Sequence, residues 1–312
     1  MVKKILIAGG TGLVGANLTK RFQTLDYSVT STKFNNSKKE YSRFPKYDFQ
    51  NFDDCIEATK DRDIVIIAAG FFHGVQEKTS SATHTLLPNL KINASLFEAA
   101  ALNGVKQIVL ISTSTVYQQT DFPVKESDLD LNTPPYESYF GIGWTYRYIE
   151  KLAEYYARMY NIRVVILRPT NIYGPNDSFE DHKSHVIPAL IKRAIKQENP
   201  FFVWGDSNVI RDFIYVDDVV DDIIYAIESN TVPSCEPINL CNGTPVSIKE
   251  LLVKILNACK FKPEINFDRS KQKAIPYRAL DDTKYKSYFL NRKRISLEEG
   301  IQRTINWYSE NN

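Results

Sequence analysis

A chain of 312 residues with 43% hydrophobic and 24% charged residues has the composition of a globular protein with a large core, which excludes intrinsic disorder. Its 39 Lys and Arg nearly balance its 37 Asp and Glu, and because these charges are scattered along the chain we expect no nucleic-acid partner. No window approaches the roughly 18 consecutive apolar residues of a transmembrane helix, so we expect no membrane association.

The cysteines and the N-terminus indicate a reducing compartment. The 4 cysteines form no C-x-x-C pair and have no histidine at metal-ligand spacing, so we expect reduced, buried thiols and no metal site. The chain enters a strand-like run at Val2 without the apolar segment and cleavage site of a signal peptide. The sequence therefore predicts a cytoplasmic protein.

Short apolar runs alternate with helix-length segments through the first half of the chain. Strands apolar on both faces, with helices between them, are typical of a parallel sheet covered on both sides and joined by right-handed crossovers. The sequence therefore predicts an α/β fold with a Rossmann-type doubly wound parallel sheet. The expected elements are a strand over residues 4–8, a helix over 12–25, a strand over 27–32, and further strands over 63–69, 107–112 and 163–167.

The pattern changes after Pro169, where turns interrupt shorter helices. We expect a Rossmann domain over residues 1–170 and, over residues 171–312, mainly a smaller lobe that covers the carboxyl ends of the strands. Residues of about 213–241 are expected to rejoin the first domain as one more helix and strand. The helices expected in the second half lie over 186–197, 216–227, 247–259 and 296–309.

A glycine-rich turn follows the first strand and opens the first helix. Glycine permits the tight turn and lets backbone N–H groups approach a pyrophosphate, whose charge the helix N-terminus also favours. The alternative is a plain glycine-rich turn. Because the turn stands between a strand and a helix, we favour a dinucleotide site formed by Gly9, Gly12, Leu13, Val14 and Gly15.

The residues after the second strand bear on the choice between NAD and NADP. An acid there would accept the ribose 2′-OH of NAD, but the segment offers no carboxylate, whereas Lys33 suits the 2′-phosphate of NADP. A solvated loop lysine is an equally weighted alternative, so the sequence predicts NADP or NAD, with NADP preferred. Asp48 and Phe49, at the end of an expected third strand, are candidates to contact the adenine, and an ordinary turn aspartate is the alternative.

Several motifs in their order along the chain resemble the extended short-chain dehydrogenase/reductase family of nucleotide-sugar epimerases, dehydratases and reductases. This resemblance implies a nicotinamide cofactor lined also by Ala68 and Ala69, a nucleotide-sugar substrate, and a homodimer paired through long helices, for which residues 143–160 are the candidate. The alternative is that the tyrosines of that helix pack inside one subunit and not against a second copy. The motifs are the glycine turn, Ala68-Ala69-Gly70 and residues 110–117, 168–175 and 211–218.

Residues 184–190 and 203–205 are similar to the GDP-L-fucose synthases, a branch of that family. The resemblance implies that Thr113 bonds the sugar oxygen at the reacting carbon and that His185 is an acid/base. Thr115 stands where the branch has a proton-transferring cysteine, and a hydroxyl is too weak an acid to replace a thiol, which disfavours a 3,5-epimerisation. Strand-end hydroxyls and a capping or core histidine are the alternatives.

The same resemblance implies a set of residues that bind the substrate. A guanidinium suits a diphosphate through its fork of donors, and an indole offers a face to a base. A surface arginine and a packing tryptophan are the alternatives. The expected substrate-binding residues are Asn171, His185, Val186, Arg193, Trp204 and Arg211.

The family's catalytic Tyr-x-x-x-Lys pair is replaced in this chain. Counted back without a gap from Arg168, the tyrosine position is Ile142 and the lysine position is Tyr146. Ile142 cannot donate a proton, whereas Tyr146 is a candidate to bond the cofactor ribose or to take over proton transfer. A helix-face aromatic is the alternative for Tyr146.

Two functions of different classes therefore remain open. The first is a nucleotide-sugar oxidoreductase or epimerase in which Thr113, His185 or Tyr146 transfers the proton; losing a general acid costs about a hundred- to ten-thousand-fold in rate without abolishing the chemistry. The second is a cofactor- or nucleotide-sugar-binding regulatory protein without turnover. We favour the enzyme, because His185, Arg193 and Arg211 are all present on the substrate side.

Overall fold

The computed structural model describes residues 2–36, 38–71, 82–180, 184–268, 270, 275–289 and 293–311. Its largest sheet has six strands in the order β10-β5-β4-β3-β1-β2, and neighbouring strands run parallel throughout. The doubly wound α/β fold predicted from the sequence is confirmed. The strands are β1 (Lys4–Ala8), β2 (Ser28–Ser31), β3 (Ile64–Ile67), β4 (Gln107–Ile111), β5 (Arg163–Pro169) and β10 (Ile238–Leu240).

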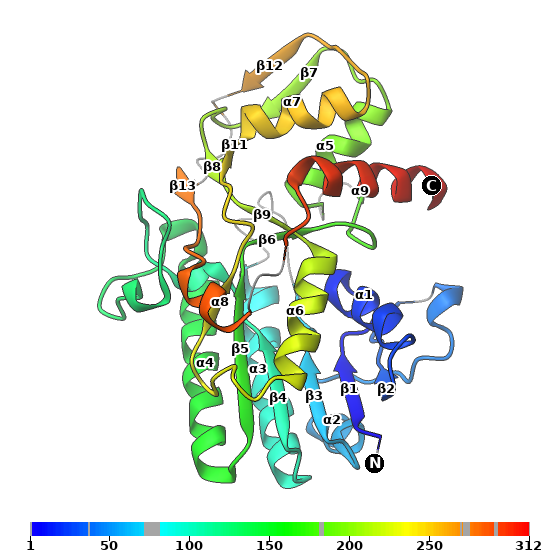
Figure 1. Cartoon of the computed structure of the whole chain (residues 1–312), viewed down its shortest axis with the longest axis vertical. Coiled ribbons are helices and arrows are strands. Elements are labelled where there is room, and N and C mark those ends of the chain that lie inside the picture. Colours follow the sequence, from blue (N-terminus) through cyan, green and yellow to red (C-terminus); the bar gives the residue numbers. More distant parts are fainter. Residues whose placement is uncertain are drawn as a thin grey trace.

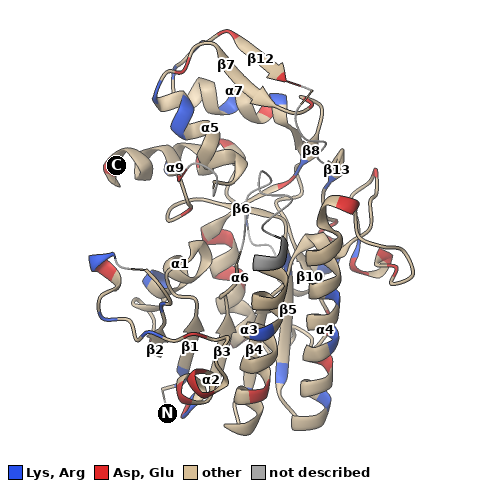
Figure 2. Cartoon of the chain, turned by 180° about the vertical axis from the view of Figure 1, so that it is seen from behind, with Lys and Arg blue, Asp and Glu red and all other residues tan. Residues whose placement is uncertain are grey.

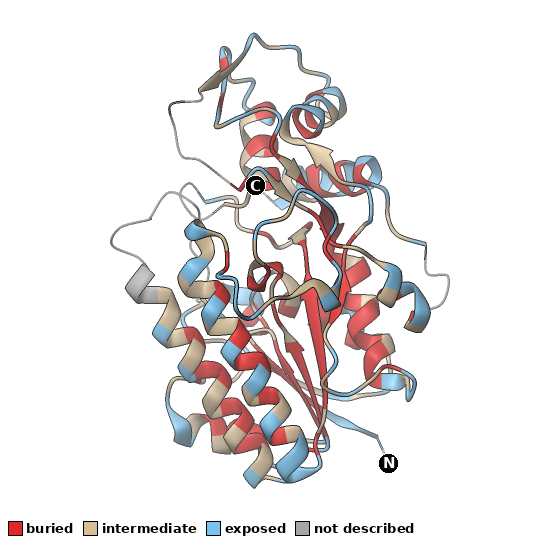
Figure 3. Ribbon diagram, turned by 90° about the vertical axis from the view of Figure 1, so that its left-hand side faces the viewer, coloured by how far each residue is buried: buried red, intermediate tan, exposed pale blue. Residues whose placement is uncertain are grey.

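Helices cover both faces of this sheet because successive strand residues point to opposite sides. Ile5 and Ile7 of β1 pack with α1 (Leu13–Phe22) and α6 (Val216–Glu228) on one face. Leu6 and Ala8 pack on the other face, which is covered by α2 (Phe52–Thr59), α3 (Ala82–Leu102) and α4 (Phe140–Tyr160). Figure 3 shows the buried strands enclosed between these helices.

A second lobe lies above the carboxyl ends of the strands (Figure 1). It has a core of its own, in which residues of α5, α7 and α9 meet strands β7 and β9. Ser247 begins α7 with a capping box, because its hydroxyl accepts the Glu250 N–H while Glu250 bonds back to the Ser247 N–H. The helices of this part are α5 (Val186–Ile195), α7 (Ile248–Ala258) and α9 (Leu297–Asn311), whereas α8 (Thr283–Tyr288) packs on the first lobe, where Tyr285 joins the core beside α6 and β10.

Short strands connect the two lobes. Residues of β6 and β9 pair in parallel at the base of the upper lobe, and β13 pairs with β8 beside them. Acidic and basic residues are spread along the chain in both lobes (Figure 2). The strands are β6 (Asn171–Tyr173), β7 (Phe201–Trp204), β8 (Ile210–Arg211), β9 (Phe213–Tyr215), β11 (Val246–Ser247), β12 (Ile265–Asp268) and β13 (Tyr277–Arg278).

One expected element is absent. No strand ends at Asp48 and Phe49 in the described part of this loop, where the pairing is a single bridge between Lys33 and Lys46. The reason is local: Asp48 accepts the Gln50 N–H and so closes a turn instead of extending a strand. Among the described residues, no helix has the length and apolar character needed to cross a membrane.

Candidate active site

The glycine turn is built for close backbone packing. Gly9 has φ +92°, a conformation that favours glycine, and its carbonyl accepts the Gly12 N–H at 3.2 Å. A Cβ on Gly15 would lie 2.0 Å from the Gly9 carbonyl oxygen, whereas a Cβ on Gly12 would meet nothing nearer than 3.7 Å. Helix α1 begins directly after Gly12 with Leu13 and Val14, so its unpaired N-terminal amides suit an anion at this turn.

The turn meets the end of β3. A Cβ on Gly9 would lie 2.7 Å from backbone atoms of Ala69, and the Ala68 N–H donates to the Ala8 carbonyl at 2.9 Å. Gly9, Ala68 and Ala69 are therefore brought together at one edge of the sheet, as a dinucleotide crossing that edge requires.

The predicted ribose and adenine residues lie beyond β2. Lys33 is half-buried, and its ammonium group donates to the carbonyls of Tyr41 and Ser42 at 3.0 and 3.3 Å, so it is not a freely solvated loop lysine. The Asp48 carboxylate bonds the Gln50 N–H, and Phe49 is buried in the core. Through these two hydrogen bonds Lys33 holds the loop that follows β2, and its ammonium group lies within that loop.

Thr113, Thr115 and Tyr146 lie at the carboxyl ends of β4 and β3. The Thr113 hydroxyl caps the short helix η2 (Ser114–Val116) by accepting the Thr115 N–H at 3.1 Å, and the two threonine hydroxyls are 3.1 Å apart. The Tyr146 hydroxyl reaches the end of β3, 3.7 Å from where a Cβ on Gly70 would stand. Burial raises the pKa of Tyr146 to about 12, because it disfavours the charged phenolate.

His185 pairs with an aspartate that the sequence analysis did not single out. Its Nδ1 lies 3.0 Å from Oδ1 and 3.3 Å from Oδ2 of Asp177, whose side chain is 3% exposed. His185 stands at the N-cap position of α5, but its side chain makes no capping hydrogen bond, and Val186 begins the helix. The only sequence signal for this pair was an acid in the turn before the histidine.

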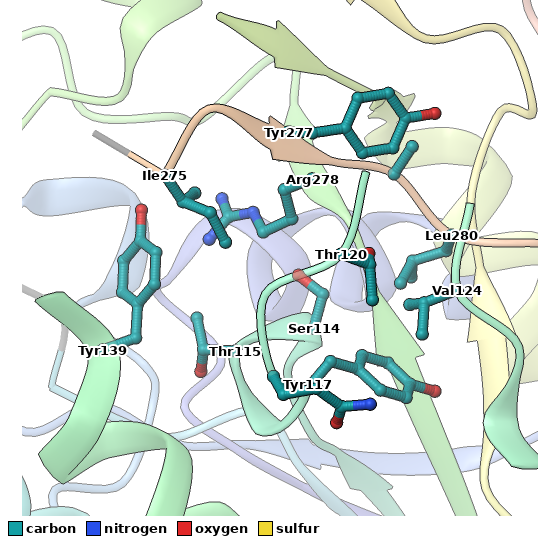
Figure 4. Close-up of a pocket in the computed structure, with 12 residues that line it drawn as sticks. Ser114, Thr115, Tyr117, Thr120, Val124, Tyr139, Ile275, Tyr277, Arg278 and Leu280 are labelled. Atoms are coloured by element: carbon teal, nitrogen blue, oxygen red, sulfur yellow. The ribbon is translucent and has the colours of Figure 1, made fainter. Parts of the chain in front are cut away.

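Arg211 and Arg278 are register partners on the paired strands β8 and β13, and Arg278 lines a pocket together with Thr115 (Figure 4). Arg278 donates to the Asn171 side-chain oxygen at 2.5 Å, and its buried Nε has no partner in the described part of the chain. Arg211 donates a hydrogen bond to Tyr139, and burial together with the neighbouring Arg278 charge lowers the pKa of Arg211 to about 10.

Arg278 was missed from the sequence. It belongs to a short strand, β13, that pairs with β8, and that pairing places it next to Arg211. The sequence before Arg278 contains none of the motifs that indicate a binding residue.

Arg193 and Trp204 lie elsewhere in the upper lobe. The Arg193 guanidinium bonds Glu198 at 2.5 Å and the Phe202 carbonyl at 2.6 Å, so it holds the start of β7 in place. Trp204, at the end of the same strand, is 56% exposed and offers an open aromatic face. The structure does not bring these two side chains to the arginine pair.

No group of three or more potential metal ligands occurs among the residues with described positions. The cysteines are free thiols; Cys55 and Cys241 are buried, and Cys235 and Cys259 are half-buried.

A family model described as the NAD dependent epimerase/dehydratase family matches residues 5–241. Among curated relatives, GDP-L-fucose synthase of Escherichia coli K12 is 29% identical, covering 99% of this chain and 97% of its own. GDP-L-fucose synthase 1 of Arabidopsis thaliana is 26% identical, covering 99% and 94%, and GDP-L-colitose synthase of Yersinia pseudotuberculosis is 25% identical, covering 98% and 97%.

Solved structures with the same fold span the whole chain. UDP-glucose 4-epimerase of Thermotoga maritima has a TM-score of 0.88 at 22% identity and covers 99% of both chains. A GDP-6-OMe-4-keto-L-xylo-heptose reductase of Campylobacter jejuni has a TM-score of 0.86 at 22% identity, covering 100% of this chain and 99% of its own. A GDP-L-fucose synthetase of Naegleria fowleri bound to NADP has a TM-score of 0.84 at 24% identity, covering 99% and 94%.

Proposed function

Because the chain belongs to the NAD-dependent epimerase/dehydratase family, we propose that it is a nicotinamide-dependent oxidoreductase or epimerase that acts on a nucleotide sugar, with a GDP-sugar preferred. The observation that carries the substrate class is the pair of neighbouring guanidiniums, of buried Arg211 and half-buried Arg278, beside the pocket that Arg278 and Thr115 line. The GDP preference rests on full-length relatives named as GDP-L-fucose and GDP-L-colitose synthases.

The two arginines bind the substrate diphosphate. The neighbouring Arg278 charge helps to lower the pKa of Arg211, and an anion bound between the two guanidiniums removes that repulsion. Arg278 also has a buried N–H that a phosphate oxygen would satisfy. Asn171 fixes Arg278, while Trp204 stacks on the nucleotide base and Arg193 supports the strand that carries Trp204.

Nicotinamide dinucleotide binds across the glycine turn. The first amides of α1 bind its diphosphate, Ala68 and Ala69 line its path, and the basic loop after β2, with Lys33 inside it, favours NADP. The bound nicotinamide supplies or accepts the hydride.

Proton transfer falls to His185 rather than to α4. Ile142 has no proton to donate, and a phenol with a pKa of about 12, such as Tyr146, exchanges protons poorly at neutral pH. Tyr146 instead donates a hydrogen bond to the cofactor at the end of β3. Thr113 and Thr115 orient the sugar oxygens through their linked hydroxyls.

A homodimer through α4 accompanies this function. Trp144, Tyr148, Tyr155 and Met159 recur at helical spacing and are 37%, 57%, 53% and 64% exposed. An apolar stripe of this size on a long helix suits pairing with a second copy of the chain. We further propose that residues 1–170, rejoined by residues of about 213–241, bind the cofactor, and that the rest of the chain is mainly a substrate-binding lobe.

Turnover of reduced cofactor with a panel of GDP- and UDP-sugars, including 4-keto sugars, tests the proposal. Arg278→Gln should raise KM for the substrate about 30-fold or more, the equivalent of about 2 kcal/mol, without changing the affinity for NADP. Arg303→Gln, on the exposed side of α9, is the matched control. Tight binding of the sugars with no change in cofactor absorbance would reject the enzyme in favour of the binding protein.

A further inference from the structure

His185 and Asp177 form a pair with a defined geometry. Both carboxylate oxygens of Asp177 lie within 3.3 Å of the histidine Nδ1, and Oδ1 also accepts the Ser178 N–H at 2.8 Å. The aspartate side chain is 3% exposed and the histidine side chain 38% exposed. The carboxylate is therefore enclosed, whereas more than a third of the histidine side chain is exposed to solvent.

The carboxylate decides which ring nitrogen carries the proton. An ionised carboxylate only accepts hydrogen bonds, so the Nδ1 that faces it must carry a hydrogen. In the neutral ring the proton then resides on Nδ1, and Nε2 is the nitrogen that gains or loses a proton. Asp177 thus sets the tautomer of His185 as well as its orientation.

The loop that carries Asp177 is fixed to the helix that opens the cofactor site. The Asn17 side chain, on α1 and 8% exposed, donates to the Pro175 carbonyl at 2.8 Å and accepts from the Asn176 side chain at 3.3 Å. Asn17 lies one turn after the residue that begins α1. These bonds place Asp177 in a set position relative to the glycine turn.

The same loop is held from the other side by the C-terminal helix. The ring of Phe179 stacks on Tyr308 of α9 with centroids 4.3 Å apart, and its carbonyl accepts from Lys192 of α5 at 3.0 Å. With α1 on one side and α5 and α9 on the other, the loop has little freedom to move the carboxylate away from His185.

From this geometry we infer that Asp177 is the positioning residue of His185: it keeps the proton on Nδ1 and assigns proton exchange with the sugar to Nε2. The role of Nε2 towards the sugar rests on the proposed function. The tautomer does not, because it follows from the contacts of the free protein.

Long-range ¹H–¹⁵N correlation spectra of ¹⁵N-histidine-labelled protein measure the tautomer directly. The spectra are recorded at about pH 8.5, well above the ordinary imidazole pKa of about 6.5. The chain has 4 histidines, so the signal of His185 is assigned by its loss in His185→Gln. We expect the pattern of a ring protonated at Nδ1, and a ring protonated at Nε2 would overturn the inference.

Asp177→Ala removes the acceptor that faces Nδ1. Without that carboxylate the preference for a proton on Nδ1 is lost, so the signal of a ring protonated at Nε2 should appear. An unchanged pattern in Asp177→Ala would overturn the inference, and the wild-type spectrum decides the tautomer even if this variant does not fold.

Kinetics supply the second readout. Asp177→Asn should lower kcat by roughly 10- to 100-fold, within the contribution of a general acid or base, and change KM for the sugar by less than about threefold. Asp53→Asn, an exposed carboxylate at the start of α2, is the matched control. A rise in KM with kcat unchanged would mean that Asp177 has a structural role only, which contradicts the inference. Absence of turnover in the wild type would reject the proposed function and leave the tautomer measurement standing.

Discussion

The hydroxyl of Tyr146 lies 3.7 Å from the place that a Cβ on Gly70 would take, so a phenol from α4 meets the chain at the end of β3. That edge also holds Ala69 against Gly9, which puts the phenol beside the expected path of the cofactor. Burial raises its pKa to about 12. We therefore propose that Tyr146 donates a hydrogen bond to the cofactor and does not exchange a proton near neutral pH.

Tyr146→Phe tests this separation of roles. Loss of one hydrogen bond should weaken NADP binding by roughly 3- to 10-fold, measured by calorimetry. At saturating cofactor, kcat should stay within about threefold, because the phenol does not transfer the proton. A fall in kcat of a hundredfold or more would make Tyr146 the general acid.

Ile142→Tyr combined with Tyr146→Lys should increase the rate of cofactor oxidation. The new ammonium lowers the pKa of the new phenol, and a general acid matched to the operating pH contributes up to about a hundredfold or more. Each single change supplies one partner only and serves as a control. Complete loss of activity in the double variant would mean that proton transfer depends on Ile142 or Tyr146 itself.

Gly12→Ala and Gly15→Ala should both weaken NADP binding, but for different reasons. In Gly15→Ala the Cβ lies 2.0 Å from the Gly9 carbonyl oxygen, so the turn must shift and both thermal stability and NADP binding should fall. In Gly12→Ala the nearest atom is 3.7 Å away, so the melting temperature should hold while binding drops, because the methyl group occupies the approach of the diphosphate. Unimpaired NADP binding by Gly12→Ala would show that the diphosphate does not bind at this turn.

Glu150→Gln should destabilise the protein strongly. Glu150 and Arg168 form two hydrogen bonds of 2.9 and 2.6 Å between side chains that are 7% and 3% exposed, and Ser112 adds a third bond to the carboxylate. Removing one charge of a buried pair leaves the other uncompensated, at a cost of about 3–5 kcal/mol in the free energy of unfolding. Urea denaturation measures it. Glu154→Gln, one turn further along α4, should cost about 0.5 kcal/mol or less.

Asp212 makes stability depend on pH in the direction opposite to most carboxylates. Burial raises its pKa from 3.8 to about 6, so between these values the folded state binds more protons than the unfolded state, and the stability due to this group falls as pH rises from about 4 to 6. Asp212→Asn should therefore gain on the order of 2–3 kcal/mol over wild type at pH 7, and little of it at pH 4. Asp53→Asn, at an exposed position of α2, is the control. A pH-independent difference between Asp212→Asn and wild type would contradict the assignment.

The sequence by itself determined the fold class, the family and the dinucleotide turn. Apolar runs and a strand–glycine–helix order are local patterns, and they report on structure because backbone hydrogen bonding and burial act over neighbouring residues. The same reasoning failed at Asp48, where a side-chain bond to Gln50 closes a turn. The proposed catalytic and binding residues, the dimer and the cytoplasmic location remain predictions.

Only the tertiary structure decided which side chains meet. Asp177 contacts His185 because a loop docks on Asn17, and Arg278 joins Arg211 because a two-residue strand pairs with β8. The raised pKa of Tyr146 likewise follows from its burial in the folded chain. Contacts and burial of this kind depend on segments far apart in the chain, and no local pattern records them, because the electrostatic environment of a side chain is set by its neighbours in space.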